Sequence, residues 1–237
     1  MNEQQPQQPL LRLKREQSLK GIRKVIASRL GTIWREAVHV TIQKKIDITE
    51  LNSRKSALAF SMIDYIYYSI VLTLKMEEYS AWNAHFDGQV LSAYSSINLG
   101  LATDHPKGLI VPVIHGADAM NMAQFVTRRK ELMAKVKAWK HSADELESGT
   151  FTITNLGTLG IDWFTPILNP PQTAILGIGR ITHESISWDK DSVPSIKATL
   201  PLSLTIDHRI LDGADAARFM MTLETQLESL VQASRDI

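Results

Sequence analysis

The apolar residues of this chain change their spacing several times, and that change limits the folds open to it. Three segments, 18–30, 61–77 and 119–139, repeat apolar residues every three or four positions, as does the last stretch after residue 214, and this spacing predicts amphipathic helices. Short runs rich in apolar and β-branched residues predict strands at 38–48, 90–94, 97–103, 109–114, 151–155 and 198–206. The alternation predicts an α/β fold, in which a few long helices cover a mixed sheet.

The chain is long enough for a substantial core. Its 237 residues contain no internal linker, so we expect one domain over 19–237. Residues 1–18 are rich in Gln, Pro and charge and predict a flexible tail. The uncharged run 65–74 is about half of the roughly 20 residues that a membrane span needs. The N-terminus lacks the apolar core of a signal peptide, which predicts a cytoplasmic protein.

Composition excludes several classes of function. A formal net charge of +1 argues against a dedicated nucleic-acid-binding protein. The absence of cysteine excludes disulfides, thiol nucleophiles and cysteine metal sites. The histidines show no metal-ligand spacing, so we expect no metal. The sequence Gly177-Ile178-Gly179 lacks the third glycine and the following helix of a dinucleotide-binding loop.

The stretch 205–213, Thr-Ile-Asp-His-Arg-Ile-Leu-Asp-Gly, places His208 where an apolar strand gives way to a helical pattern. Imidazole is the side chain best suited to accept a proton near neutral pH, because its ordinary pKa is about 6.5. Asp212 follows four residues later, where it can orient a neighbour or cap the next helix. Alone, the motif also fits a surface histidine before a capped helix.

Residues 207–213 resemble the Asp-His-Arg-x-x-Asp-Gly signature of the 2-oxoacid dehydrogenase acyltransferase catalytic domain. This is the dihydrolipoyl acyltransferase family, which is related to chloramphenicol acetyltransferase. Further stretches follow the order of the family's motifs: 22–30, 97–102, 108–114, 149–157, 165–172 and 174–177. The resemblance therefore covers roughly residues 21 to 230.

The resemblance implies a chloramphenicol-acetyltransferase-like two-layer sandwich that forms trimers, with each active site in a channel between neighbouring subunits. It implies that His208 is the general base and that Asp212 orients it, both from one subunit. It also implies that Thr154, from the next subunit, donates a hydrogen bond to the oxyanion. By the same resemblance, Arg23 or Arg29 can pair with a buried carboxylate such as Asp212, as an arginine does in related acyltransferases. Without the family, a strand threonine and helix-surface arginines need no function.

The implied acyl donor is acetyl-CoA or another acyl-CoA. The residues that bind coenzyme A are not identified by the sequence. Family members typically carry lipoyl and partner-binding domains before this domain, whereas only about 20 residues precede it here, so we expect no attached lipoyl group. That favours a free-standing enzyme that acetylates a small-molecule hydroxyl, as lipoyl-less relatives do in tetronate-type natural-product biosynthesis.

Two other readings stay open. The chain can be the dihydrolipoyl acyltransferase core of a 2-oxoacid dehydrogenase complex, with a carrier-bound acceptor whose lipoyl domain lies on another chain. It can also be a non-catalytic assembly core, although the presence of His208, Asp212 and Thr154 counts against that. In each case we expect a homotrimer or a multiple of trimers.

Overall fold

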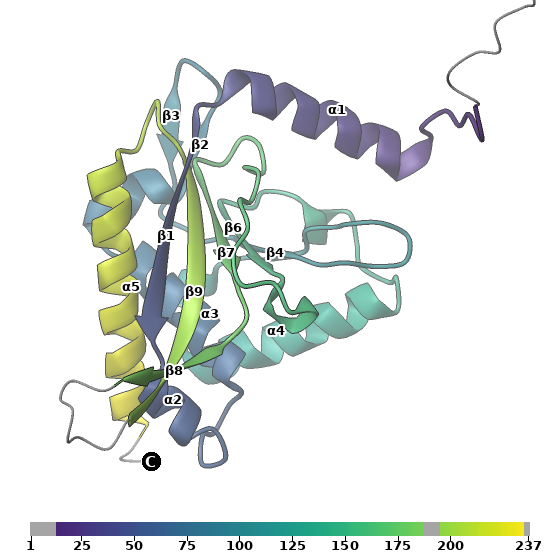
Figure 1. The fold of residues 1–237 in the computed structure, drawn as a ribbon. Helices are drawn as coiled ribbons and strands as arrows, with labels where there is room; N and C mark the ends of the chain where they lie inside the picture. Colours follow the sequence, from purple (N-terminus) through teal and green to yellow (C-terminus); the bar gives the residue numbers. More distant parts are fainter. Residues whose placement is uncertain (1–12, 187–194, 235–237) are drawn as a thin grey trace, which may run out of the picture.

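The computed structural model describes residues 13–186 and 195–234, and its centre is a seven-stranded mixed sheet (Figure 1). The strands lie in the order β1-β9-β7-β6-β4-β5, with β8 paired to the free part of β9. Their bounds are β1 His39–Asp47, β4 Leu99–Ala102, β5 Val113–Ile114, β6 Phe151–Asn155, β7 Ala174–Ile178, β8 Thr182–Ile186 and β9 Ser195–Asp207. Neighbours β4, β6 and β7 are parallel and the other pairs are antiparallel, which confirms the predicted mixed sheet.

The described residues form five α-helices: α1 Gly21–Glu36, α2 Thr49–Ser53, α3 Met62–Leu74, α4 Met122–Lys137 and α5 Gly213–Ala233. Short 3-10 helices η1 Glu77–Trp82, η2 Ala117–Ala119, η3 Asp144–Leu146 and η4 Gly157–Leu159 join them, and β2 Ala84–Phe86 pairs with β3 Leu91–Ala93 as a hairpin. Within the described ranges, no helix has the length and apolar character needed to cross a membrane.

One face of the sheet is closed by helices α3, α4 and α5. Side chains alternate between the faces of a strand, so the even-numbered residues of β9 from Leu200 to Ile206 point to the helices, and all are buried. Phe219 of α5 stacks on Trp82 with ring centroids 4.6 Å apart, and both belong to this large core. Burial of apolar surface on this face provides the main stabilisation of the fold.

The opposite face, which we call the hydroxyl face, consists of the odd-numbered residues of β1 and β9 and their neighbours across the sheet. Thr41 Oγ1 lies 2.7 Å from Thr205 Oγ1, and Gln43 donates to Ser203 Oγ at 3.3 Å. A smaller apolar cluster on this face contains Ile33, Ala37, Leu168 and Ile175. The segment 161–173 covers part of the face, since the ring of Phe164 fills the space where Gly177 lacks a Cβ atom.

Helix α1 reaches outward from the sheet, and its C-terminal end packs on the body through Ile33 and Leu30 (Figure 1). Its side chains Val25 and Trp34 are 56% and 58% exposed. One long-range contact comes from Arg29, whose Nη2 donates to the carbonyl oxygen of Pro170 at 3.1 Å. A helix with this exposed apolar surface resembles half of an interface.

Most of the predicted elements are confirmed, with shifted ends. The strand predicted over 109–114 is wrong in extent, because β5 contains only Val113 and Ile114. Pro112, which precedes them, has no N–H to donate to a ladder. The tail predicted over 1–18 falls mostly outside the described residues, which begin at 13.

Candidate active site

His208 lies on a tight turn between β9 and α5, at the end of the sheet. The amides of Ile210 and Leu211 both donate to the carbonyl oxygen of Asp207 at 3.0 Å, and the His208 amide donates to Val38 O at 2.8 Å. The His208 side chain is 38% exposed. The backbone of this residue is therefore fixed while its imidazole stays accessible to a substrate.

Asp212 is at the N-cap of α5, and its backbone N–H points to Asp215 Oδ2 at 3.4 Å. Its Oδ1 also lies 3.5 Å from Nδ1 of His208. Both sequence readings of Asp212, the cap and the orienting group, thus fit the same side chain. Asp212 therefore faces the Nδ1 side of the ring, and Nε2 of His208 has no hydrogen-bond partner among the described residues.

The expected pairing of Asp212 with Arg23 or Arg29 is wrong within one chain. Asp212 is 77% exposed rather than buried, and Arg29 donates to Pro170 instead. The reason is the direction of α1, the helix that contains both arginines, because it extends away from the start of α5 (Figure 1).

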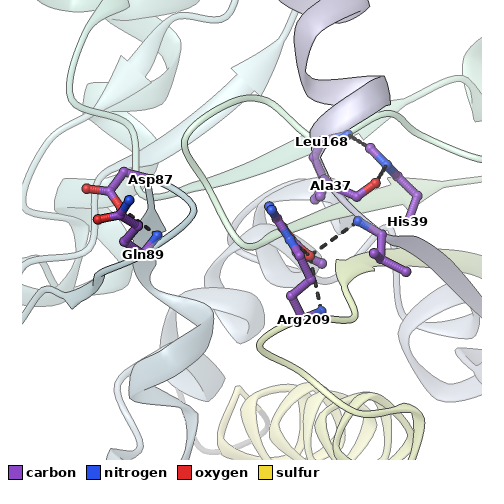
Figure 2. A network of polar contacts seen from close by, with 8 residues as sticks. Ala37, His39, Asp87, Gln89, Leu168 and Arg209 are labelled. Atoms are coloured by element: carbon purple, nitrogen blue, oxygen red, sulfur yellow. Dashed lines mark hydrogen bonds and ion pairs between the residues drawn. The ribbon is translucent and has the colours of Figure 1, made fainter.

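The buried aspartate of the motif is Asp207, which our reading of the sequence did not select. Its carboxylate accepts from Arg209 Nε at 2.9 Å, from Arg209 Nη2 at 2.6 Å and from the Arg209 amide at 3.1 Å. Burial raises the pKa of the Asp207 carboxyl, but the hydrogen bonds and charge of Arg209 outweigh it and hold that pKa below its ordinary value. Figure 2 shows Arg209 beside the segment from Ala37 to His39.

Thr154 lies on β6 and points to the hydroxyl face, like Thr152 two residues earlier. The Thr152 hydroxyl donates to Gln172 Oε1 at 2.6 Å and accepts from Asn169 Nδ2 at 3.2 Å. The Thr154 hydroxyl, by contrast, has no hydrogen-bond partner among the described residues. It is therefore available to an external acceptor.

One chain does not bring Thr154 to His208. Thr154 is in register with Gly177, and Gly177 with Ser203, four residues before Asp207 on β9. Strand geometry then gives about 14 Å along the sheet and about 10 Å across it between Thr154 and the end of β9. The two predicted catalytic groups lie on separate parts of the chain's surface.

Two pockets flank β6, and neither is lined by His208, Asp212 or Thr154. A pocket of about 190 Å³ with a mixed polar and apolar lining includes Arg29, His85, Asn169 and Gln172. A mostly apolar pocket of about 440 Å³ lies between α3 and the ends of β6 and β7. In the part of the chain that the structure describes, no group of three His, Asp or Glu side chains is placed to hold a metal ion.

Comparisons with known proteins agree on one family of acyltransferases. Residues 12–234 match the family described as 2-oxoacid dehydrogenases acyltransferase (catalytic domain). The chain is 34% identical over 216 residues to the dihydrolipoyllysine-residue acetyltransferase component of the acetoin cleaving system of Bacillus subtilis (strain 168), covering 88% of this chain and 54% of that protein. It is 36% identical over 212 residues to the same component of the pyruvate dehydrogenase complex of Cupriavidus necator, covering 85% and 37%. The chain thus spans about half or less of these relatives' length.

Solved structures agree. A probable dihydrolipoamide acetyltransferase from Listeria monocytogenes superposes with a TM-score of 0.82 at 27% identity, covering 91% of this chain and 95% of that one. A dihydrolipoamide acetyltransferase of Azotobacter vinelandii, studied for the roles of a serine, a histidine and an asparagine in its catalytic mechanism, gives 0.80 at 29% identity, covering 93% and 96%. Chloramphenicol acetyltransferase shares the fold at 10% identity, with a TM-score of 0.50 over 86% of this chain and 94% of that one.

Proposed function

Because this chain belongs to the acyltransferase family of 2-oxoacid dehydrogenase catalytic domains, we propose that it transfers an acetyl or short acyl group between coenzyme A and a dihydrolipoyl thiol. It would then act as the acyl-transfer core of a 2-oxoacid dehydrogenase complex, on the lipoyl group of a separate lipoyl domain. The relatives named as dihydrolipoyllysine-residue acetyltransferases favour this reading over acetylation of a small-molecule hydroxyl, which the sequence alone had put first.

The observation that carries the proposal is the spacing of three polar residues. In the Azotobacter vinelandii enzyme the named serine precedes the named histidine by 52 residues, and the asparagine follows the histidine by four. Here Thr154 precedes His208 by 54 residues and Asp212 follows it by four. A hydroxyl, an imidazole and a short polar side chain thus recur in the same order, with a threonine and an aspartate as the local variants.

The residue types give the mechanism. Neutral His208 accepts the proton of the attacking thiol on Nε2, and the thiolate sulfur bonds to the carbonyl carbon of the acyl thioester. The oxyanion that forms accepts a hydrogen bond from the Thr154 hydroxyl. When the carbon–sulfur bond to the leaving group breaks, the imidazolium returns its proton to the departing sulfur. Asp212, which lies on the Nδ1 side of the ring, contributes to its orientation.

The separation of Thr154 from His208 supports a site shared between subunits. If both groups act on one carbonyl, Thr154 must come from a neighbouring copy, so we propose a homotrimer or a multiple of trimers in which residues 19–237 form the catalytic domain. The exposed apolar side chains Val25 and Trp34 on α1 suit coverage by such a neighbour. A relative at 30% identity was solved as the cubic core of a pyruvate dehydrogenase complex.

The test is mass spectrometry of acetyl-CoA reactions with dihydrolipoamide or with a panel of primary alcohols. We expect acetyl-dihydrolipoamide from the wild type, and a loss of about 10²- to 10⁴-fold in rate for His208→Ala. His183→Ala, on β8 beside the far end of β9, is the matched control and should keep wild-type activity. Acetylation of an alcohol with dihydrolipoamide ignored would establish the hydroxyl reading instead. Full activity of His208→Ala would refute the mechanism.

A further inference from the structure

The two residues that flank His208 in the sequence, Asp207 and Arg209, form an ion pair with each other. Asp207 is 2% exposed, and both of its carboxylate oxygens lie within 3.1 Å of Arg209 Nε. The guanidinium Nη2 adds a contact of 2.6 Å to Oδ2, so the pair has the two-pronged geometry of a strong arginine–carboxylate interaction. With the side chains on both sides locked together, the backbone of residue 208 has little freedom.

The pair is also tied to three other parts of the chain. The Val38 amide points to Asp207 Oδ1 at 3.4 Å, and the Val38 carbonyl oxygen accepts a hydrogen bond from the His208 amide at 2.8 Å. The Asp207 amide donates to Thr173 O at 2.9 Å. The Arg209 guanidinium lies 4.8 Å from the ring centre of Phe86 in the β2–β3 hairpin. The His208 turn is therefore fixed from β1, from the segment before β7 and from the hairpin.

The contact on the other side of His208 is weak by comparison. Asp212 Oδ1 is 3.5 Å from Nδ1, beyond an ordinary hydrogen bond, and the Asp212 side chain is 77% exposed. Ion pairs exposed to this degree are screened by water, so Asp212 alone gives the imidazole little restraint. The stronger restraint is on the backbone side, through Asp207 and Arg209.

The geometry points to Asp207 and Arg209 as a pair of positioning residues that hold His208 in its reactive orientation. This inference rests on the proposed function, since it gives His208 the role of base. Neither residue reaches the reacting atoms. A misplacement of about 1 Å can cost about 10²-fold in rate, so loss of the pair should lower kcat while leaving substrate binding in place.

Asp207→Asn and Arg209→Gln test the pair. Arg209→Lys keeps the positive charge but cannot make the two-pronged contact with the carboxylate. For the first two we expect kcat to fall about 10- to 100-fold, with KM for both substrates within about twofold of wild type. Arg209→Lys should recover part of the loss. The double variant Asp207→Asn/Arg209→Gln should lose no more than the worse single variant, because the two residues act as one unit.

The control lies at the other end of the same strand pair. Asp47 Oδ1 accepts a hydrogen bond from the amide of Thr49, two residues on, at 2.9 Å, and Oδ2 lies 3.0 Å from Lys197 Nζ. Asp47 thus shares with Asp207 an amide donor at the same spacing and a cationic partner, but it is more exposed and lies far from His208. Asp47→Asn should keep wild-type kcat. Phe86→Leu, which removes the ring under Arg209 but keeps an apolar side chain, provides a milder test if Asp207→Asn does not fold, and should lower kcat less than Arg209→Gln does.

The assay uses the acceptor that wild-type protein acetylates, which separates the two proposals. A wild type that transfers no acyl group to any acceptor overturns both. An active wild type with unchanged kcat in Asp207→Asn and Arg209→Gln overturns the positioning role alone. So does a rise in KM, or a lower unfolding temperature, with kcat per folded molecule unchanged. A fall in kcat at constant KM, with recovery by Arg209→Lys, supports it.

Discussion

The two faces of the sheet are built from the same strands, but one face packs the apolar core and the other carries polar side chains. On the helical face, the even-numbered residues of β9 and their neighbours form one large apolar core beneath α3, α4 and α5. On the hydroxyl face, Thr and Ser side chains pair across strands, and one small apolar cluster lies under the end of α1. The period of two along a strand separates the faces, so stability and chemistry can be assigned to alternate residues.

Strand β6 shows the separation within five residues. Phe151 and Ile153 are buried in the helical-face core, whereas Thr152 and Thr154 point the other way. The hydroxyl of Thr152 forms hydrogen bonds within the chain, to Gln172 and Asn169. The neighbouring hydroxyl of Thr154 is not used among the residues that the structure describes. Only the second therefore fits a role toward a substrate.

The largest effect is expected on the helical face, from Phe219→Ala. Phe219 is fully buried, stacks on Trp82 and meets the ring of Tyr79 edge-on at 5.2 Å. Its loss should lower the free energy of unfolding by about 3–5 kcal/mol, because a large cavity remains. Denaturant unfolding measures this. Met221→Ala, an exposed change on the same helix, should stay within about 0.5 kcal/mol of wild type.

The activity per folded molecule of Phe219→Ala tests whether the helical face contributes to stability alone. Phe219→Ala should keep the kcat of the wild type once the folded fraction is taken into account. A loss of kcat as large as that of a hydroxyl-face variant, at full folding, would show that the two faces are not separable.

Thr154→Val should have the reverse effect. Valine keeps the shape and removes the hydroxyl, so the oxyanion loses a donor and kcat should fall about 10²- to 10³-fold, or about 2.7–4 kcal/mol in the barrier. Because the hydroxyl has no partner within the described part of the chain, the free energy of unfolding should change by less than about 0.5 kcal/mol. Steady-state kinetics and denaturant unfolding on the same sample measure both.

Thr152→Val is the matched control for that variant. It leaves Gln172 and Asn169 without the hydroxyl they share in a buried site, which should cost about 1–3 kcal/mol of stability. Its kcat should fall far less than that of Thr154→Val. Equal losses of activity in the two variants would contradict a special role for Thr154.

The sequence predicts elements whose cause is local and misses contacts between distant segments. Periodicity predicts α3, β9 and α5 because each buries a regular stripe. The motif at 207–213 predicts His208 and Asp212 as site residues, and the family resemblance predicts Thr154. The catalytic roles of all three residues stay predictions. The burial of Asp207 was not predictable from spacing, since it depends on contacts with Val38, Thr173 and Arg209. The Asp-x-Arg pair inside the motif was the available signal, but nothing in a linear pattern shows which aspartate is buried.

The smallest expected effect comes from a polar contact on the helical side, at Glu145 in η3. This side chain ties η3 to α4, with Lys135 Nζ at 2.8 Å and Arg128 Nη2 at 3.0 Å from Oε1. The hydrogen bond from Lys135 is the main cause that lowers the pKa of Glu145 from 4.5 to about 2. The carboxylate therefore stabilises the fold above about pH 4.5, and this contribution is lost as the pH falls toward 2.

Glu145→Gln should accordingly lower the unfolding temperature at pH 7 and reduce the difference in stability between pH 5 and pH 2 relative to wild type. Thermal unfolding across that range measures both, and Glu131→Gln, exposed on α4, should follow the wild-type curve. Acetyl transfer at pH 7 should be unchanged, because Glu145 joins η3 to α4, which packs on the helical core, and contacts none of the three residues proposed for catalysis. A variant with wild-type acid stability but reduced kcat would place function on the helical side and break the division between the faces.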